Sequence, residues 1–170
     1  MAVLPVLQYP DKRLRLIAEP VTDFGAQTQK IIDDMFETLY ASEDTGGYAA
    51  IQMNIQQRII VIDYSEKKDQ PLCVINPEFL ERRGEVFEME GCLSVPGDTY
   101  CRVKRAEWVK VRAQDRHGKS FDIEADGYLS RCLQHETDHL NGILFIDYLS
   151  PLKRKLLDAR LKKQQARISV

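Results

Sequence analysis

Long apolar runs are missing from this sequence of 170 residues, so we expect no helix that crosses a membrane. Residues 1–5 lack the charged start and long apolar stretch of a secretory signal, so we expect a cytoplasmic protein that does not bind membranes. The sequence has no internal repeat, low-complexity tract or obvious linker. With 44% hydrophobic and 29% charged residues, it predicts one domain over residues 1–170 with a sizeable core.

Cysteine and histidine are scarce. Four cysteines occur, which is too few and too scattered for a disulfide framework in a cytoplasmic chain of this size, so we interpret them as thiols or metal ligands. Only three histidines occur, and two of them, His135 and His139, are four residues apart. That spacing makes them the first candidates for a functional site.

The charge is close to balanced overall but uneven along the chain. The formal net charge is −2, yet residues 151–170 hold seven cations and one anion, which leaves −8 for residues 1–150. A basic end on an acidic body is typical of a docking surface for an anionic partner, and equally of a solvated helix. Both interpretations stay open at this point.

Apolar periodicity and turn signals predict a mixed fold. Helical spacing and capping residues predict three helices, over residues 26–42, 127–140 and 151–168. Short apolar or alternating runs predict four strands, over residues 58–63, 72–77, 108–113 and 120–125. We expect Asn76-Pro77 to end the second strand and residues 115–118 to form a hairpin turn. Hairpin strands with separate helices indicate an α+β fold.

The segment from His135 to His139 is typical of a helix that holds a catalytic metal. A helix turns about 100° per residue, so both imidazoles lie on nearly one face and can reach a single ion. Glu136 beside them fits a general base that exchanges a proton with water. The competing interpretation is a surface helix with two incidental histidines, which the glutamate in register makes the weaker one.

A third ligand has to come from elsewhere in the chain. The longer protease pattern requires a histidine six residues after His139, but that position is Phe145, so the pattern fails. His117 falls in a predicted turn that faces solvent. Cys73 falls in a buried run, where a free cysteine usually packs. Cys101 lies in a charged segment with no further signal.

Cys92 is the best remaining candidate, although spacing alone does not exclude the other cysteines. It follows Gly91, whose backbone can approach an ion closely. Cys132 is three residues before His135, and as a fourth ligand it would close the site, so we expect it in the wall of a pocket. Two histidines and one cysteine leave a coordination position open for water, which favours a catalytic site over a structural one.

With these residues identified, the chain resembles the peptide deformylases over nearly its whole length. The resemblance is carried by three segments in the family's order: Gly47-Tyr48-Ala49-Ala50-Ile51-Gln52, Glu90-Gly91-Cys92-Leu93-Ser94 and His135-Glu136-Thr137-Asp138-His139. It implies an α+β fold with antiparallel β-sheets around a central metal-binding helix, an N-terminal helix and a C-terminal helix. It also implies one catalytic domain.

The resemblance implies hydrolysis of the N-formyl group on the N-terminal methionine of newly synthesised proteins, with release of formate. It implies that Cys92, His135 and His139 bind Fe²⁺, with Zn²⁺, Ni²⁺ or Co²⁺ also able to occupy the site. The donor types do not decide between these metals, since two imidazoles and a thiolate suit zinc at least as well as iron.

Catalytic roles and partners also follow from the resemblance. Glu136 would move the proton, while the side-chain amide of Gln52 and the backbone N–H of Leu93 would stabilise the oxyanion. The substrate would be a formylated nascent polypeptide. The basic helix over residues 151–170 would dock on the ribosome, and we expect a monomer that does not bind DNA.

The chain departs from the family pattern around the expected substrate pocket. Thr45 replaces a glycine, Tyr48 replaces a leucine, and Gly46 stands where relatives usually have an aliphatic residue. Tyr128 and Arg131 replace aliphatic residues on the face of the helix that carries His135. Arg131 either reaches solvent at the pocket mouth or makes the pocket more polar. The substrate-binding residues implied by the resemblance are Gly46, Gly47, Glu90, Gly91, Tyr128, Arg131 and Cys132.

Two alternatives remain at the level of function. The first is a related metallo-amidase or peptidase whose N-terminal preference is altered by Gly46, Tyr128 and Arg131. The second is a protein with a structural ion and a basic tail that binds RNA. The presence of both Glu136 and Gln52 argues against the second alternative.

Overall fold

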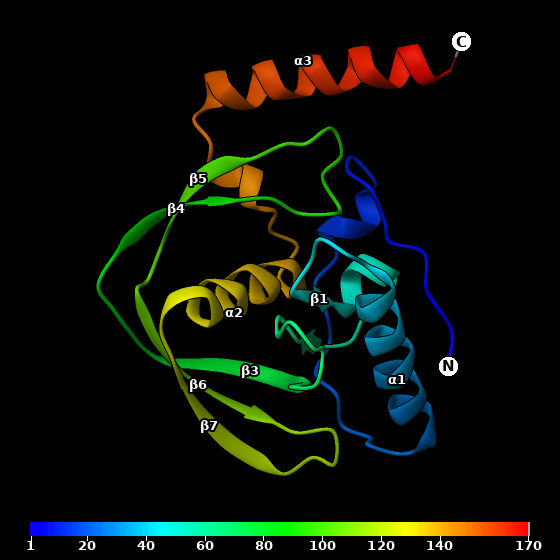
Figure 1. The fold of residues 1–170 in the computed structure, drawn as a ribbon, viewed down its shortest axis with the longest axis vertical. Coiled ribbons are helices and arrows are strands. Elements are labelled where there is room, and N and C mark those ends of the chain that lie inside the picture. Colours follow the sequence, from blue (N-terminus) through cyan, green and yellow to red (C-terminus); the bar gives the residue numbers. More distant parts are fainter. Residues whose placement is uncertain (170) are drawn as a thin grey trace.

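The computed structural model describes residues 1–169 (Figure 1). Its three α-helices are α1 (Ala26–Ala41), α2 (Gly127–Leu140) and α3 (Pro151–Ile168). Its strands are β1 (Gly47–Ala49), β2 (Ile59–Ile62), β3 (Leu72–Arg83), β4 (Val86–Glu90), β5 (Cys101–Arg105), β6 (Trp108–Gln114) and β7 (Ser120–Ala125). Short 3₁₀ turns are η1 (Lys12–Arg15), η2 (Ala50–Met53) and η3 (Phe145–Tyr148).

Two antiparallel sheets surround α2. One sheet has the order β1-β2-β3-β6-β7, and the second is the β4-β5 hairpin. Figure 1 shows α2 between these sheets, with α1 to one side and α3 beyond the hairpin. Leu133 and Leu140 of α2 are fully buried against the five-stranded sheet. The predicted α+β class, with antiparallel sheets around a central helix, is therefore confirmed.

Strand β2 is apolar at every position because helices cover both of its faces. Ile60 and Ile62 pack into the cluster that contains α2, whereas Ile59 and Val61 pack into the cluster under α1. Successive strand residues point to opposite faces, so a strand without polar positions must be buried on both. Each fully buried side chain of this size contributes roughly 1.5–3 kcal/mol of transfer free energy. Burial on both faces fixes β2 between α1 and α2.

The predicted end of the second strand was wrong, because β3 continues through Asn76-Pro77 to Arg83. Asn76 adopts the left-handed conformation, with φ of 53°, and the register with β6 shifts between Ile75 and Glu78. The Asn76 side chain accepts a hydrogen bond from the Val21 N–H at 2.8 Å and donates one to Gln114 at 2.7 Å. These hydrogen bonds stabilise a β-bulge at this point of the strand. A bulge tolerates Pro77, because proline has no backbone N–H to donate to the neighbouring strand.

The sequence analysis missed the β4-β5 hairpin, β1 and η2. Strand β4 has exposed or half-buried residues at four of its five positions, so it gives no alternating apolar signal. The hairpin matters for the site, because Glu90 ends β4 and the segment that carries Cys92 follows at once. The 3₁₀ turn η2 contacts α2 and places Gln52 beside the segment that follows β4.

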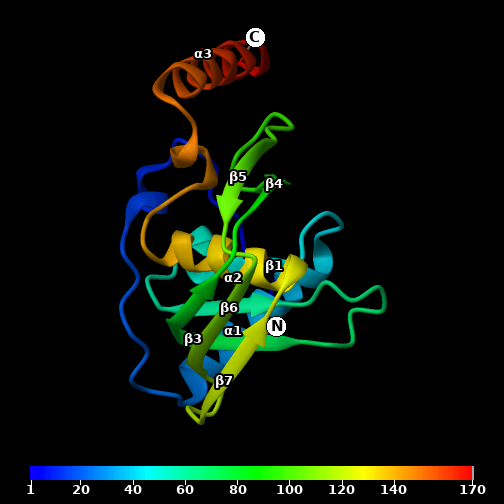
Figure 2. The same ribbon diagram turned by 90° about the vertical axis from the view of Figure 1, so that its left-hand side faces the viewer.

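Helix α3 begins as the sequence predicts. The Ser150 side chain accepts a hydrogen bond from the Lys153 N–H, and Pro151 occupies the first helical position. Leu157 and Leu161 are buried in a third apolar cluster, which ties the helix to the body. Figure 2 shows α3 at one end of the molecule, past the hairpin. None of the helices in residues 1–169 is both long and apolar enough to cross a membrane.

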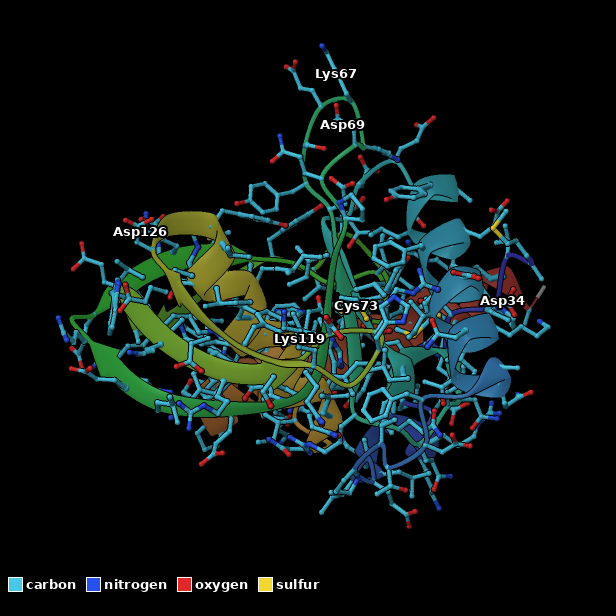
Figure 3. All side chains as sticks on the ribbon, turned by 90° about the horizontal axis from the view of Figure 1, so that it is seen from below. Asp34, Lys67, Asp69, Cys73, Lys119 and Asp126 are labelled. Carbon is cyan, nitrogen blue, oxygen red and sulfur yellow. The ribbon has the colours of Figure 1, made fainter. Side chains whose placement is uncertain are left out.

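A long loop joins β2 to β3 on another side of the molecule. Figure 3 shows this loop leaving the body with Lys67 and Asp69 at its tip, while Asp126 marks the start of α2. Tyr64 at the base of the loop contacts Tyr128 of α2, with ring centroids 4.9 Å apart and ring planes tilted by 60°. The loop therefore contributes one side chain to the surroundings of the site helix.

Candidate active site

Three candidate ligands converge beside α2. His135 and His139 lie one helical turn apart, with ring centroids 5.0 Å apart. Cys92 lies in the segment after β4, with its Sγ 3.3 Å from His139 Nε2. The ligand atoms of the three residues all lie within 4.8 Å of one another. The structure therefore brings together the three residues that the sequence analysis selected as metal ligands.

The other soft donors lie outside this cluster. His117 is exposed in the turn between β6 and β7, while Cys73 and Cys101 are half-buried in β3 and β5. Cys132 is buried, and burial raises the pKa of its thiol well above the usual value, so it stays protonated. Within residues 1–169, Cys92 is thus the thiol that faces both imidazoles.

The donor set fits a divalent ion of the transition series. The Nδ1 atom of His135 is 2.9 Å from Glu90 Oε2, so its Nε2 faces the cluster. Burial is the main reason that the pKa of His139 lies well below its usual value, and the nearby His135 ring lowers it further. A neutral imidazole is the form that ligates a metal. One thiolate and two imidazoles form the protein part of a tetrahedral site with one position left.

A buried ion-pair network holds the His135 ring through its Nδ1 atom. Arg105 donates to both oxygens of Glu90, at 2.7 and 3.0 Å, and to Asp138 at 2.6 Å. Burial opposes ionisation of Glu90, but hydrogen bonds from Arg105 and His135 outweigh it and lower the pKa to about 2. Glu90 therefore stays charged and fixes the tautomer and orientation of the His135 ring. Glu90 lines the cavity, as predicted, but both of its oxygens are engaged by protein groups.

Arg105 was missed by the sequence analysis. It lies in β5 near two other cations, Arg102 and Lys104, and nothing in the local pattern separates it from them. Only its side chain, 4% exposed, is enclosed by acidic partners. Pairing of β4 with β5 would not have revealed it either, since the register places Arg105 opposite Val86 and Glu90 opposite Cys101.

Glu136 lies next to the ligand cluster with one oxygen unpartnered. The residue is 5% exposed, and its Oε2 has no hydrogen-bond partner within residues 1–169. Burial raises the pKa of Glu136 to about 7, although the His135 ring acts in the opposite direction. A carboxyl group that titrates near neutrality beside a cavity is suited to proton transfer.

Gln52 and Leu93 line the same cavity as Glu136. The Gln52 Oε1 atom accepts a hydrogen bond from the Ala49 N–H at 2.9 Å, which fixes the amide. Its Nε2 is directed toward the site, 3.1 Å from Ser94 Oγ and 3.6 Å from Cys92 Sγ. The Leu93 carbonyl accepts a hydrogen bond from Gln8 Nε2 at 2.7 Å, which holds this part of the chain in place.

These residues line one cavity of about 360 Å³, open to solvent. Its walls are the segment after β4 on one side and the site-facing stripe of α2 on the other. The predicted pocket residues Gly47, Gly91, Tyr128, Arg131 and Cys132 all line it. Gly46 does not line the cavity and lies beneath the hydroxyl of Tyr128 instead. Residues on the cavity wall that the sequence analysis did not name include Asp44, Met89, Asp98 and Tyr100.

Close packing explains two of the pocket glycines. A Cβ atom on Gly91 would lie 2.5 Å from the ring of Tyr100, and one on Gly47 would lie 3.1 Å from Cys132 Sγ. Neither glycine has a positive φ, so tight packing and not the backbone conformation disfavours a larger residue at these positions.

The chain is similar to known proteins over nearly its whole length. The sequence model of the polypeptide deformylase family matches residues 3–155. This chain belongs to the peptide deformylase family. It is 57% identical over 165 residues to the peptide deformylase of Tolumonas auensis, which is 96% of each protein.

Solved peptide deformylases share the fold. The Legionella pneumophila structure has a TM-score of 0.90 at 47% identity and covers 98% of this chain and 99% of its own. The Thermus thermophilus structure has a TM-score of 0.85 at 38% identity, covering 97% of this chain and 96% of its own.

As a peptide deformylase, the protein is a metal-dependent hydrolase that removes the N-formyl group from the N-terminal methionine of newly synthesised proteins and releases formate. A match of this identity over nearly the full length does not favour the alternative amidase or peptidase. It equally disfavours a non-enzymatic role with a structural ion.

Proposed function

We propose that residues 1–170 form one catalytic domain in which Cys92, His135 and His139 hold a single divalent ion. The observation that carries this proposal is the convergence of three ligand atoms within 4.8 Å beside a buried, unpartnered carboxylate oxygen. When bound, the ion would polarise the formyl oxygen and favour ionisation of water. We propose Fe²⁺ as the ion, with Zn²⁺, Ni²⁺ or Co²⁺ as ions that the same donors accept.

In this mechanism Glu136 moves the proton. Its Oε2 accepts a proton from the attacking water and then delivers it to the amine nitrogen as the formyl C–N bond breaks. Formate and a free N-terminus are the products. The position of Glu136 next to His135 and its burial support this role.

Gln52 and Leu93 stabilise the negative charge that develops on the formyl oxygen. The Gln52 Nε2 atom and the Leu93 backbone N–H are the proposed donors. Because Ala49 holds the Gln52 carbonyl oxygen, the amide cannot rotate away without losing a buried hydrogen bond. Glu90 and Arg105 act indirectly: Arg105 holds Glu90, and Glu90 fixes the ring of His135.

The direct test is anaerobic purification, metal analysis and a formate-release assay on a formyl-methionyl peptide. We expect about one ion per chain and one formate per free amine produced. Anaerobic handling matters because a thiolate ligand is sensitive to oxidation. An enzyme loaded with metal that releases no formate would contradict the proposal.

We further propose that the enzyme works as a monomer in the cytoplasm, does not bind DNA, and docks on the ribosome through α3. The proposed cytoplasmic location is supported by the substrate, because the substrate is a nascent formylated chain. Two cations of α3 are engaged internally, since Arg154 contacts Tyr9 and Asp147, and Arg160 contacts Thr99. The exposed cations that remain for an anionic partner are Lys153, Lys155, Lys162, Lys163 and Arg167.

Charge reversal tests docking better than deletion, because Leu157 and Leu161 belong to the core. The double change Lys162→Glu and Lys163→Glu should weaken ribosome binding and lower its salt dependence, while hydrolysis of a short peptide stays unchanged. Lys67→Glu, at the tip of the β2-β3 loop, is the matched control. Equal ribosome binding by both proteins would exclude docking through α3.

A further inference from the structure

Arg131 is the only lysine or arginine among the residues that line the cavity in the described part of the chain. Its guanidinium has no hydrogen-bond or ion-pair partner within residues 1–169 and instead lies over the ring of Tyr128, with Cζ 5.9 Å from the centroid. The residue is half-buried. A guanidinium is always charged, and its N–H edges need acceptors from water or from a ligand. The substrate cavity therefore presents an unused donor group.

Tyr128 has taken over space that relatives usually give to an aliphatic side chain at position 46. Gly46 has no positive φ, so its backbone does not require glycine. A Cβ atom there would lie 2.6 Å from Tyr128 Oη and 3.0 Å from Tyr64 Cβ. The Tyr128 ring also contacts Tyr64, with centroids 4.9 Å apart. The outer wall of the cavity is thus aromatic, with the Tyr128 hydroxyl beside Gly46.

Arg131 lies close to where the first substrate residue has to bind. It precedes His135 by four positions on α2, which places their Cβ atoms about 5–6 Å apart on one face. A formyl carbon held between His135 and Glu136 puts the adjoining side chain against this stripe. Cys132 closes the inner end, since its Sγ packs against Gly47. Arg131 therefore lies within the same cavity wall that a first side chain would contact.

We infer that Arg131 enables the enzyme to deformylate chains whose first residue is methionine sulfoxide, in addition to unoxidised methionine. Oxidation adds a strong acceptor oxygen near the end of a side chain that otherwise has only a weakly accepting sulfur. The Arg131 N–H groups supply the matching donors. This inference rests on the proposed function of the same site. Only the formyl C–N bond is hydrolysed, and the sulfoxide passes through unchanged, so no redox partner is needed.

The experiment compares kcat/KM for formate release from a formyl-methionyl tripeptide and from its sulfoxide, using the metal-loaded enzyme. The measured quantity is the ratio of sulfoxide to unoxidised substrate. In Arg131→Ile this ratio should fall about tenfold or more, which is the usual effect of losing a hydrogen bond to a charged group. In Arg131→Lys the ratio should fall less than in Arg131→Ile. Lys119→Ile removes the same charge in the turn between β6 and β7, at a residue that does not line the cavity, and should leave the ratio unchanged.

The ratio also separates the inference from its competitors. If Arg131→Ile keeps the wild-type ratio, or if the ratio rises, the inference is wrong. A third tripeptide with aspartate in second position tests whether Arg131 binds the next residue, and a loss confined to that peptide would overturn the assignment. If Arg131→Ile does not fold, Arg131→Gln replaces it and should lower the ratio in the same direction. Wild-type enzyme that releases no formate from any peptide would contradict the proposed function instead.

Discussion

Glu136 combines two properties that a proton carrier needs: a buried position beside the ligand cluster and an oxygen without a protein partner. Glu136→Gln keeps the shape and removes the proton acceptor. We expect turnover to fall by about 10²–10⁴-fold, because this is the usual contribution of a general base. Metal content should stay the same, as none of the three ligands changes. Metal analysis beside the formate assay distinguishes this outcome from loss of the ion, which would point to a structural role.

Arg105 shows how much a buried charge depends on its partners. Arg105→Met leaves the carboxylates of Glu90 and Asp138 without their common cation, and we expect a loss of about 3–5 kcal/mol in the free energy of unfolding. Metal affinity should also fall about 10–100-fold, since Glu90 would no longer hold His135 firmly. Urea unfolding and competition with a metal chelator measure the two effects.

Arg112→Met is the matched control for this change. Arg112 also lies in a strand and pairs with one carboxylate, Asp122, but its side chain is 56% exposed. Exposed pairs typically contribute about 0–1 kcal/mol, so the control should cost little and leave metal affinity unchanged. Similar losses for both variants would show that the enclosure of Arg105 is not what makes it important.

At the scale of elements, the sequence predicted best where one strong periodic signal governs the structure. Helices α1, α2 and α3 and strands β2, β6 and β7 lie within one or two residues of their predicted bounds, because their apolar positions and caps are local features. Two of the three proposed metal ligands could be brought together from the sequence for the same reason, since their spacing along α2 places them on one face. The β4-β5 hairpin could not, because its stability comes from pairing between polar strands that no local pattern reveals.

Asn76 is the element-scale feature that contradicted expectation, and it can be tested directly. Asn76→Ala removes hydrogen bonds to Val21 and Gln114. It also forces alanine, whose side chain cannot form a hydrogen bond, into the left-handed region. We expect a loss of about 2–4 kcal/mol in unfolding free energy. Asn76→Gly loses the same bonds but tolerates the conformation, so it should lose about 1–2 kcal/mol less. Equal losses would show that the backbone conformation is not costly here.

For the whole molecule, the ends of the chain are tied to the site by a small number of polar contacts. Asp147 in η3 accepts hydrogen bonds from Arg15 of η1 and Arg154 of α3, so it joins the N-terminal segment to the C-terminal helix. The Tyr9 N–H donates to the Ser94 carbonyl beside the site, and the Tyr9 hydroxyl donates to Asp158 of α3. The sequence could not have predicted these contacts, since most of them join residues more than 80 positions apart.

The Asp147 contact should make stability depend on pH. Burial opposes its ionisation, but hydrogen bonds from Arg15, the Leu144 N–H and Arg154 outweigh it, so the pKa of Asp147 lies below its usual value. A carboxyl group with a lowered folded pKa stabilises the protein above its unfolded pKa of about 3.9, and that stability is lost as pH falls through the folded pKa. Asp147→Asn should therefore cost about 1–3 kcal/mol at pH 7 and progressively less below about pH 4.

The measurement is the difference in unfolding free energy between wild type and Asp147→Asn at pH 7, 5 and 3.5, because a difference cancels the titration of the other carboxylates. Asp126→Asn is the control: Asp126 is an exposed helix N-cap whose side chain makes no capping hydrogen bond, so its variant should match wild type at each pH. A cost for Asp147→Asn that is the same at pH 7 and pH 3.5 would mean that the Asp147 charge does not join the chain ends. In that case the buried side chains of Leu157 and Leu161, together with the hydrogen bonds of α3 to Tyr9 and Thr99, would hold α3 on the body.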